Sequence, residues 1–195
     1  MASEKKPELP IFSFGSQAEW RKWLEKNQDE PHGIWLQFFK KGSGISTVVY
    51  AEALDEALCF GWIDGQLKRL DEKSYLQRFT PRRARSTWSK RNIDHVARLE
   101  SEGKMAEAGR REVEKAKADG RWENSYDSQS NMTIPDDLMR ELTKDPKIKA
   151  FWESLNKVNQ YAIVWRIQTA SSQGIRENRM RAILEMLTKE EKIHP

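Results

Sequence analysis

The stretch from Thr47 to Arg91 constrains the fold more than any other part of the chain. It opens with the amphipathic segment VVYAEALDEALCF, in which apolar residues recur at every third or fourth position, as on one face of a helix. Gly61 follows, where a left-handed residue commonly ends a helix. The segments WIDGQLKRL and YLQRFT come next, and Pro81 ends the second. We therefore predict a helix followed by an antiparallel pair of strands.

Alternation along these strands assigns side chains to faces. We expect four side chains of the first strand to share one face: Trp62, Asp64, Gln66 and Lys68. The opposite face then carries Ile63, Gly65 and Leu67.

The remaining segments predict one more long strand and many helices. Ser16 with Glu19 forms a capping box that starts a helix over EWRKWLEKN. The segment GIWLQFFKK has aromatic residues on both faces and is predicted to be an interior strand. From Asn92 onward only helices are expected. The fold class is α+β: a small antiparallel sheet packed with helices, followed by a helical C-terminal bundle.

Length and patterning together predict three regions. A chain of 195 residues most often forms one domain, or one domain with a helical extension. We expect an α+β core over residues 1–120 and a polar, unpatterned linker loop over residues 121–135. A helical C-terminal subdomain covers residues 136–195 in this prediction.

Charge and cysteine content exclude several classes of protein. The chain has 34 basic and 30 acidic residues, and this net charge of +4 argues against a nucleic-acid partner. Cys59 is the one cysteine, so there is no internal disulfide and no CxxC pair. Neither a signal peptide nor an apolar stretch of membrane-spanning length is found, so we expect a soluble cytoplasmic protein without membrane insertion.

The known nucleotide, hydrolase and zinc motifs are absent from the sequence, and we predict no cofactor and no metal. The segment Gly42-Ser43-Gly44 has two readings. It is either an ordinary loop or an anion-binding nest of backbone N–H groups.

The candidate site lies in the basic, aromatic half of the first stretch. Six basic residues and no acidic residue fall between Arg78 and Arg91, and guanidinium groups bind phosphate or carboxylate oxygens well. Two tryptophans are placed to wall a pocket for a flat ring. The predicted ligand-binding residues are Trp62, Arg78, Arg82, Trp88 and Ser89. The alternative is that both tryptophans are core residues, that Arg78 pairs with Asp64, and that the other basic residues are solvated.

Asp64 is the candidate catalytic residue, because a carboxylate that follows a large aromatic side chain can be desolvated and act as a general base. An Arg78 partner would instead keep it ionised. His95 has two readings, a proton shuttle or a half-exposed helix histidine. Cys59 is interpreted as a small buried apolar residue.

The chain resembles a known family. The segment EALCFGWIDGQ, then RFTPR, then STWS with Asn92 three residues on, is similar to the signature of the YdeI/OmpD-associated, or bacteriocin-protection, proteins. YAIVWRIQTA followed by IRENRMRAIL resembles a second signature of that family, although Arg166-Ile167 stands where a Trp-Ile pair is usual. The resemblance runs from about Phe14 to Leu187. It implies a link to antimicrobial or stress protection but no established reaction.

Three functions follow from these observations. The favoured one is a binding protein for a small anionic or aromatic ligand, because aromatic and basic residues are interleaved as in a concave site. The second is an enzyme that uses Asp64 with Arg78, and the sequence leaves turnover open. The third is a protein- or nucleic-acid-interaction module that uses the basic run 78–91, with a possible protein partner at the C-terminal helices.

Overall fold

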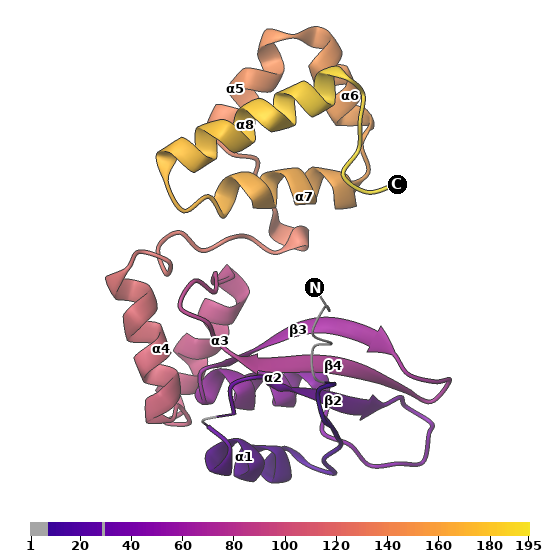
Figure 1. Ribbon diagram of the computed structural model, residues 1–195, viewed down its shortest axis with the longest axis vertical. Coiled ribbons are helices and arrows are strands. Elements are labelled where there is room, and N and C mark those ends of the chain that lie inside the picture. The colour runs from indigo at the N-terminus through magenta and orange to yellow at the C-terminus, as the bar shows by residue number, and fades with distance from the viewer. Residues whose placement is uncertain (1–7, 29) are drawn as a thin grey trace, which may run out of the picture. The chain divides into compact units, whose positions relative to one another are not determined.

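The computed structural model (Figure 1) describes residues 8–28 and 30–195. The chain forms two compact units. The sheet unit comprises the described residues up to Ser86 together with Asp94–Asp119, and the helical unit comprises Thr87–Ile93 and Gly120–Pro195. The domain boundaries predicted at residues 120 and 135 stay a prediction, because a compact unit need not fold independently.

The sheet unit contains, among its described residues, one four-stranded sheet of order β1-β2-β4-β3. Its strands are β1 (Ile11–Phe12), β2 (Ile34–Phe39), β3 (Trp62–Arg69) and β4 (Ser74–Pro81). The α+β class is confirmed, and β2 has the predicted interior position. The strands β2, β4 and β3 are antiparallel as expected, whereas β1 pairs in parallel with β2. A crossover through helix α1 (Gln17–Lys26) returns the chain in the direction of β1, which makes that pair parallel.

Two predicted helix boundaries are confirmed. Ser16 is the N-cap of α1, and its Oγ accepts a hydrogen bond from the Glu19 N–H at 3.3 Å. The Glu19 carboxylate accepts from the Gly15 N–H at 2.9 Å, one residue earlier than in a standard capping box. Helix α2 (Tyr50–Cys59) is followed by Gly61 at φ +75°, the left-handed conformation that glycine adopts without steric cost.

The core of the sheet unit lies between one face of the sheet and the helices α1 and α2. Ile34, Leu36 and Phe38 of β2 are buried on this face. The Trp20 indole of α1 is fully buried and donates to the Ala53 carbonyl of α2 at 3.0 Å, which joins the two helices. Because buried aromatic rings remove a large apolar area from water, this layer supplies much of the unit's stability.

The alternation predicted for β3 is wrong beyond Asp64. A β-bulge between Asp64 and Leu67 shifts the register, so that Asp64 pairs with Phe79 and Leu67 with Gln77. One extra residue exchanges the two faces of a strand. Lys68 is therefore on the face opposite to Trp62 and Asp64, and Leu67 takes its place with 66% of its surface exposed.

The turn between β3 and β4 is organised by Asp71. Its Oδ1 accepts from the N–H groups of Lys73 at 2.7 Å and Ser74 at 2.6 Å, and its Oδ2 accepts from the Ser74 hydroxyl at 2.9 Å. These bonds, the Ser74 hydroxyl first, lower the pKa of Asp71. The predicted polar turn is thus an Asp-capped turn that fixes the hairpin.

The helical unit is built on one apolar core, and helices α5 to α8 carry most of it (Figure 1). Its core includes Trp152, Ile163, Val164 and Leu187. The elements are η1 (Gln129–Asn131), α5 (Asp136–Lys144), α6 (Pro146–Ser154), α7 (Lys157–Gln168) and α8 (Gln173–Thr188). As expected, the described chain forms no named strand after Asn92.

Two further helices, α3 (Lys90–Ser101) and α4 (Glu107–Ala118), follow the sheet in sequence. Within the sheet unit, α4 approaches the end of α2 closely at Gly109, and a Cβ there would lie 2.2 Å from the Cys59 carbonyl oxygen. The same oxygen accepts a hydrogen bond from the Ala106 N–H at 3.1 Å. This approach requires the absence of a side chain at Gly109.

Replacement of this glycine tests that close contact. We expect Gly109→Ala to lower the free energy of unfolding by about 1–3 kcal/mol, because the added methyl group forces α4 away from α2. Chemical denaturation followed by circular dichroism measures the change. Glu114→Ala on the exposed side of α4 is the matched control and should change stability little. A Gly109→Ala protein as stable as the wild type would contradict the contact.

Candidate functional site

Asp64 is half-buried near the start of β3. Its Oδ2 accepts a hydrogen bond from the Tyr50 hydroxyl of α2 at 2.8 Å. Among the described residues no ion pair joins Asp64 to Arg78, so the alternative of a bridge between them across the hairpin is wrong. Asp64 pairs with Phe79 and Arg78 pairs with Trp35, so the two side chains project from opposite faces of the sheet.

Arg78 is half-buried on β4, directly opposite Trp35 of β2. Its guanidinium donates one long hydrogen bond of 3.5 Å to the His32 carbonyl. Its Nε is buried and has no hydrogen-bond partner, and no carboxylate of the described residues pairs with it. By contrast, the half-buried Arg21 and Arg176 each pair with a carboxylate at 2.7 Å. Arg78 thus carries a positive charge that the sheet unit does not neutralise by contact.

Trp62 and Arg82 lie beside the Gly61 turn. Trp62 is 1% exposed and packs edge-on against Trp20 and Trp23, with ring centroids 6.4 and 5.8 Å away. The Trp62 Nε1 is buried without a hydrogen-bond partner. Arg82 is 7% exposed, and its backbone N–H donates to the Gly61 carbonyl at 2.9 Å. Trp62 therefore belongs to the aromatic core of this unit.

Trp88 and Ser89 belong to the helical unit. Trp88 is 1% exposed, and its ring centroid lies 5.0 Å from that of Trp122. Ser89 is 8% exposed, and its Oγ accepts from the Asn92 N–H at 3.1 Å. The six predicted site residues are thus divided: Trp62, Asp64, Arg78 and Arg82 in the sheet unit, and Trp88 and Ser89 in the helical unit.

A buried carboxylate in the helical unit was not identified from the sequence. Asp127 is 4% exposed; it pairs with the Lys90 ammonium and accepts from the Gln168 amide at 2.7 and 2.9 Å. Burial alone would raise the pKa of Asp127, but the hydrogen bonds from Lys90 and Gln168 lower it. Its position in an unpatterned polar segment gave no signal of this role.

Two other charged or titratable side chains, Arg176 and His95, are engaged in contacts. In the tail, Arg176 binds both oxygens of Asp137 at 2.7 Å. In the sheet unit, His95 Nδ1 lies 2.7 Å from an Asp55 oxygen, and Arg98 binds the other oxygen at 2.6 Å. Asp55 first, and Glu102 next, raise the pKa of Arg98. These contacts are typical of a structural ion-pair network.

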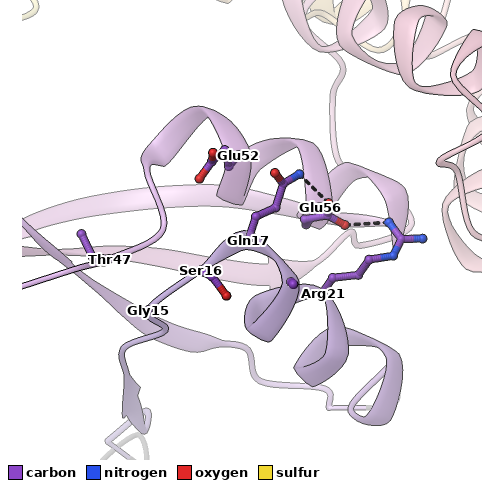
Figure 2. Close-up of a pocket in the computed structure, with 8 residues that line it drawn as sticks. Gly15, Ser16, Gln17, Arg21, Thr47, Glu52 and Glu56 are labelled. Carbon is purple, nitrogen blue, oxygen red and sulfur yellow. Dashed lines mark hydrogen bonds and ion pairs between the residues drawn. The ribbon is translucent and has the colours of Figure 1, made fainter.

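A pocket of ≈ 540 Å³ lies between the starts of α1 and α2 (Figure 2). Gln17 and Arg21 of α1 both reach Glu56 of α2, each at 2.7 Å. Glu56 is 4% exposed, so water stabilises its carboxylate little, and the paired Arg21 guanidinium is the group that balances its charge. Burial would lower the pKa of Arg21, but the hydrogen bond and charge of Glu56 raise it. With Glu52 also in the lining, the pocket holds two carboxylates and one guanidinium.

Cys59 follows Glu56 on α2 and is fully buried. Burial first, and the Glu56 carboxylate next, raise the pKa of the Cys59 thiol to about 11, although Arg21 acts in the opposite direction. The thiol is therefore neutral at ordinary pH and is a poor nucleophile.

Two features are absent from the described residues, a metal-binding cluster and a membrane-spanning helix. No group of three His, Cys, Asp or Glu side chains is placed to hold a metal ion. None of the helices has both the length and the apolar character needed to cross a membrane.

Two family models match the chain. Residues 12–112, more than half of its length, match a domain of unknown function (DUF8412). Residues 131–190 match the model described as bacteriocin-protection, YdeI or OmpD-associated (OmdA), which confirms the predicted family for this part of the chain. The first predicted signature, EALCFGWIDGQ, lies instead in the region that matches DUF8412. Comparisons with curated proteins and with solved structures found no match.

The burial of Cys59 leads to a test by thiol labelling. We expect the native protein at about pH 8 to react with an aromatic disulfide reagent at least about a hundredfold more slowly than the unfolded chain, because the native thiol is both buried and protonated. The absorbance of the released thiolate measures the rate. The chain in denaturant, with its thiol accessible, is the control. Equal rates in the two states would contradict the environment described for Cys59.

Proposed function

The chain belongs to the DUF8412 family and carries an OmdA domain at residues 131–190, and from this premise we propose that it binds a small anionic ligand. The ligand has a carboxylate or phosphate group and, by preference, a flat ring. A role in protection against antimicrobial agents is part of the proposal and rests on the description of the OmdA family alone.

The observation that carries the proposal is the charge of Arg78. A half-buried guanidinium loses part of its hydration, and this loss is costly unless an anion replaces the water. Among the described residues, the guanidinium of Arg78 has a single hydrogen bond, of 3.5 Å, to the His32 carbonyl. An anionic group of a ligand would supply the bidentate partner that neighbouring residues do not.

The neighbours of Arg78 favour a ring next to the anionic group. Trp35 is the direct cross-strand partner of Arg78, and such pairs have their side chains side by side on one face. On the other side of Arg78, Gly65 of the bulge has no side chain, and a Cβ there would lie 3.8 Å from the Arg78 Cβ. The Trp35 indole beside the Arg78 guanidinium, and the space left by Gly65, favour binding of a flat, negatively charged molecule.

The other residues predicted for the site have different parts in the proposal. Arg82 is the second basic candidate and adds positive charge near the Gly61 turn. Trp62 is buried in the aromatic core and would act by supporting the start of β3. Trp88 and Ser89, in the helical unit, remain candidates for ligand contact.

Removal of the guanidinium tests the proposal. We expect aromatic carboxylates such as benzoate, or aryl phosphates, to raise the melting temperature of the wild type. Arg78→Ala should abolish this rise, and Arg78→Lys should weaken binding by about 10–100-fold, because a lysine keeps the charge but loses the bidentate fork. Thermal melts over a ligand series, followed by calorimetric titration, measure both effects.

Arg69→Ala is the matched control, because Arg69 is exposed at the end of β3 and its side chain, among the described residues, makes one long bond of 3.5 Å to the Asp71 carbonyl. It should respond to ligands like the wild type. The proposal would be refuted by a ligand series without any response in the wild type, or by responses that Arg78→Ala leaves unchanged.

Catalysis by Asp64 is a second candidate function. The Tyr50 hydroxyl donates to the half-buried Asp64 carboxylate at 2.8 Å, and a carboxylate paired with a phenol can exchange protons with a bound molecule. Asp64 and Arg78 project from opposite faces of the sheet, so the substrate would bind beside Tyr50 and Asp64 and would be distinct from the Arg78 ligand.

The Asp64→Asn protein separates binding from catalysis. If Asp64 is the base, we expect this variant to bind any molecule that the wild type converts within about threefold of the wild-type affinity, but to convert it at least about a hundredfold more slowly. Proton NMR of the ligand during incubation measures conversion, and Tyr50→Phe shows whether the phenol takes part. A ligand that the wild-type protein leaves chemically unchanged would exclude this function and leave the binding function intact.

A further inference from the structure

The loop between β2 and α2 surrounds a second pocket of the sheet unit. This glycine loop (residues 40–47) lines, together with Phe39 and Val49, a pocket of ≈ 410 Å³. The lining contains Lys40 and Lys41 and no carboxylate. It therefore has a positive charge, whereas the pocket of Figure 2 holds more acidic than basic groups.

Two exposed glycines of the loop have left-handed backbone conformations. Gly42 has φ +89° and Gly44 has φ +77°, which residues other than glycine rarely adopt. A Cβ at either position would meet no atom within 4 Å, so tight packing does not explain these glycines. The N–H groups of Lys41, Gly42 and Gly44 donate to no atom of the described residues. Such bare N–H groups in a glycine-rich turn are suited to bind an anion.

The two lysines differ in their contacts. The Lys40 Nζ donates to the Glu72 carbonyl at 2.9 Å, and the Lys40 N–H donates to the Lys73 carbonyl at 2.8 Å, so the start of the loop is fixed to the β3–β4 turn. Lys41 is exposed and has no ion-pair partner among the described residues. Its ammonium is free to move toward an anion in the pocket.

The N-terminus of α2 contributes little to this argument. The Val49 N–H is already bound by the Glu52 carboxylate at 3.2 Å, and valine has no side-chain acceptor that would complete a capping box. The positive charge at the pocket comes from the lysines and from the bare loop N–H groups.

We infer that the glycine loop is a binding site for a phosphate group. A phosphate has several acceptor oxygens in a tetrahedral arrangement, which match several N–H donors and a mobile ammonium better than a planar carboxylate does. The Ser43 hydroxyl lies in the same lining and adds a donor. This site is separate from the ligand proposed for Arg78, because none of its lining residues belongs to β3 or β4.

Titration of the full chain with inorganic phosphate, followed by ¹H–¹⁵N NMR at constant ionic strength, tests the inference. Glycine amides resonate apart from most others, so Gly42 and Gly44 can be followed individually. We expect their signals to shift and saturate in the wild type and equally in Arg78→Ala. Lys41→Glu should raise the dissociation constant by at least about tenfold, because a favourable charge becomes a repulsive one. Lys22→Glu, the same change at an exposed position of α1, should leave it unchanged.

Three outcomes would overturn the inference. The first is that neither glycine signal responds to phosphate at concentrations up to tens of millimolar. The second is that Lys41→Glu and Lys22→Glu weaken binding equally, which would indicate only a general electrostatic effect. The third is that acetate at equal ionic strength produces the same shifts as phosphate. The spectra of each variant also report whether it is folded, so loss of structure is distinguished from loss of binding.

Discussion

The sheet unit depends on the close approach of α4 to the turn that follows α2. The Cys59 carbonyl is covered by Gly109 and bonded by the Ala106 N–H, and the carbonyl of Gly61 in the same turn is bonded by the Arg82 N–H. Gly61 is itself enclosed, since a Cβ there would lie 3.1 Å from the Ala108 carbonyl oxygen. Helix α4, the end of α2 and the end of β4 therefore meet at one turn, and two glycines make this possible. The start of β3, with Trp62 and Asp64, takes its position from the same turn.

Much of this arrangement could be predicted from the sequence, because local chemistry determines it. Gly61, the N-cap Ser16 and the apolar spacing of α2 each define a boundary through contacts within a few residues. The β-bulge could not be predicted in this way, because it depends on how β3 pairs with β4 and no residue type in the sequence marks its position. The alternative pairing of Arg78 with Asp64 failed because the register places Asp64 opposite Phe79, so that Arg78 projects from the other face of the sheet.

The candidate site was harder to predict than the fold, because burial depends on tertiary packing. In the sequence, Arg78 is one member of a run of basic residues. Its lack of a carboxylate partner among the described residues depends on how β2, β4 and β3 pair. Asp127 shows the opposite case, in which a polar segment without any pattern contains a nearly fully buried carboxylate. Composition indicates that ionic contacts exist, and only tertiary structure decides which charges are balanced.

The balance of charge in the sheet unit is consistent with the two anion sites that we propose for it. The buried Glu56 carboxylate accepts hydrogen bonds from Arg21 and Gln17, and the Glu52 carboxylate accepts one from the Val49 N–H. These carboxylates therefore have partners other than the lysines of the glycine loop. Thr47 lines both pockets, so the acidic pocket and the basic pocket are neighbours that share this residue. If the carboxylates were unpaired, they would attract Lys41 across the start of α2 and weaken any anion site there. Their internal pairing leaves the ammonium of Lys41, and separately the guanidinium of Arg78, available to a charge from outside the protein.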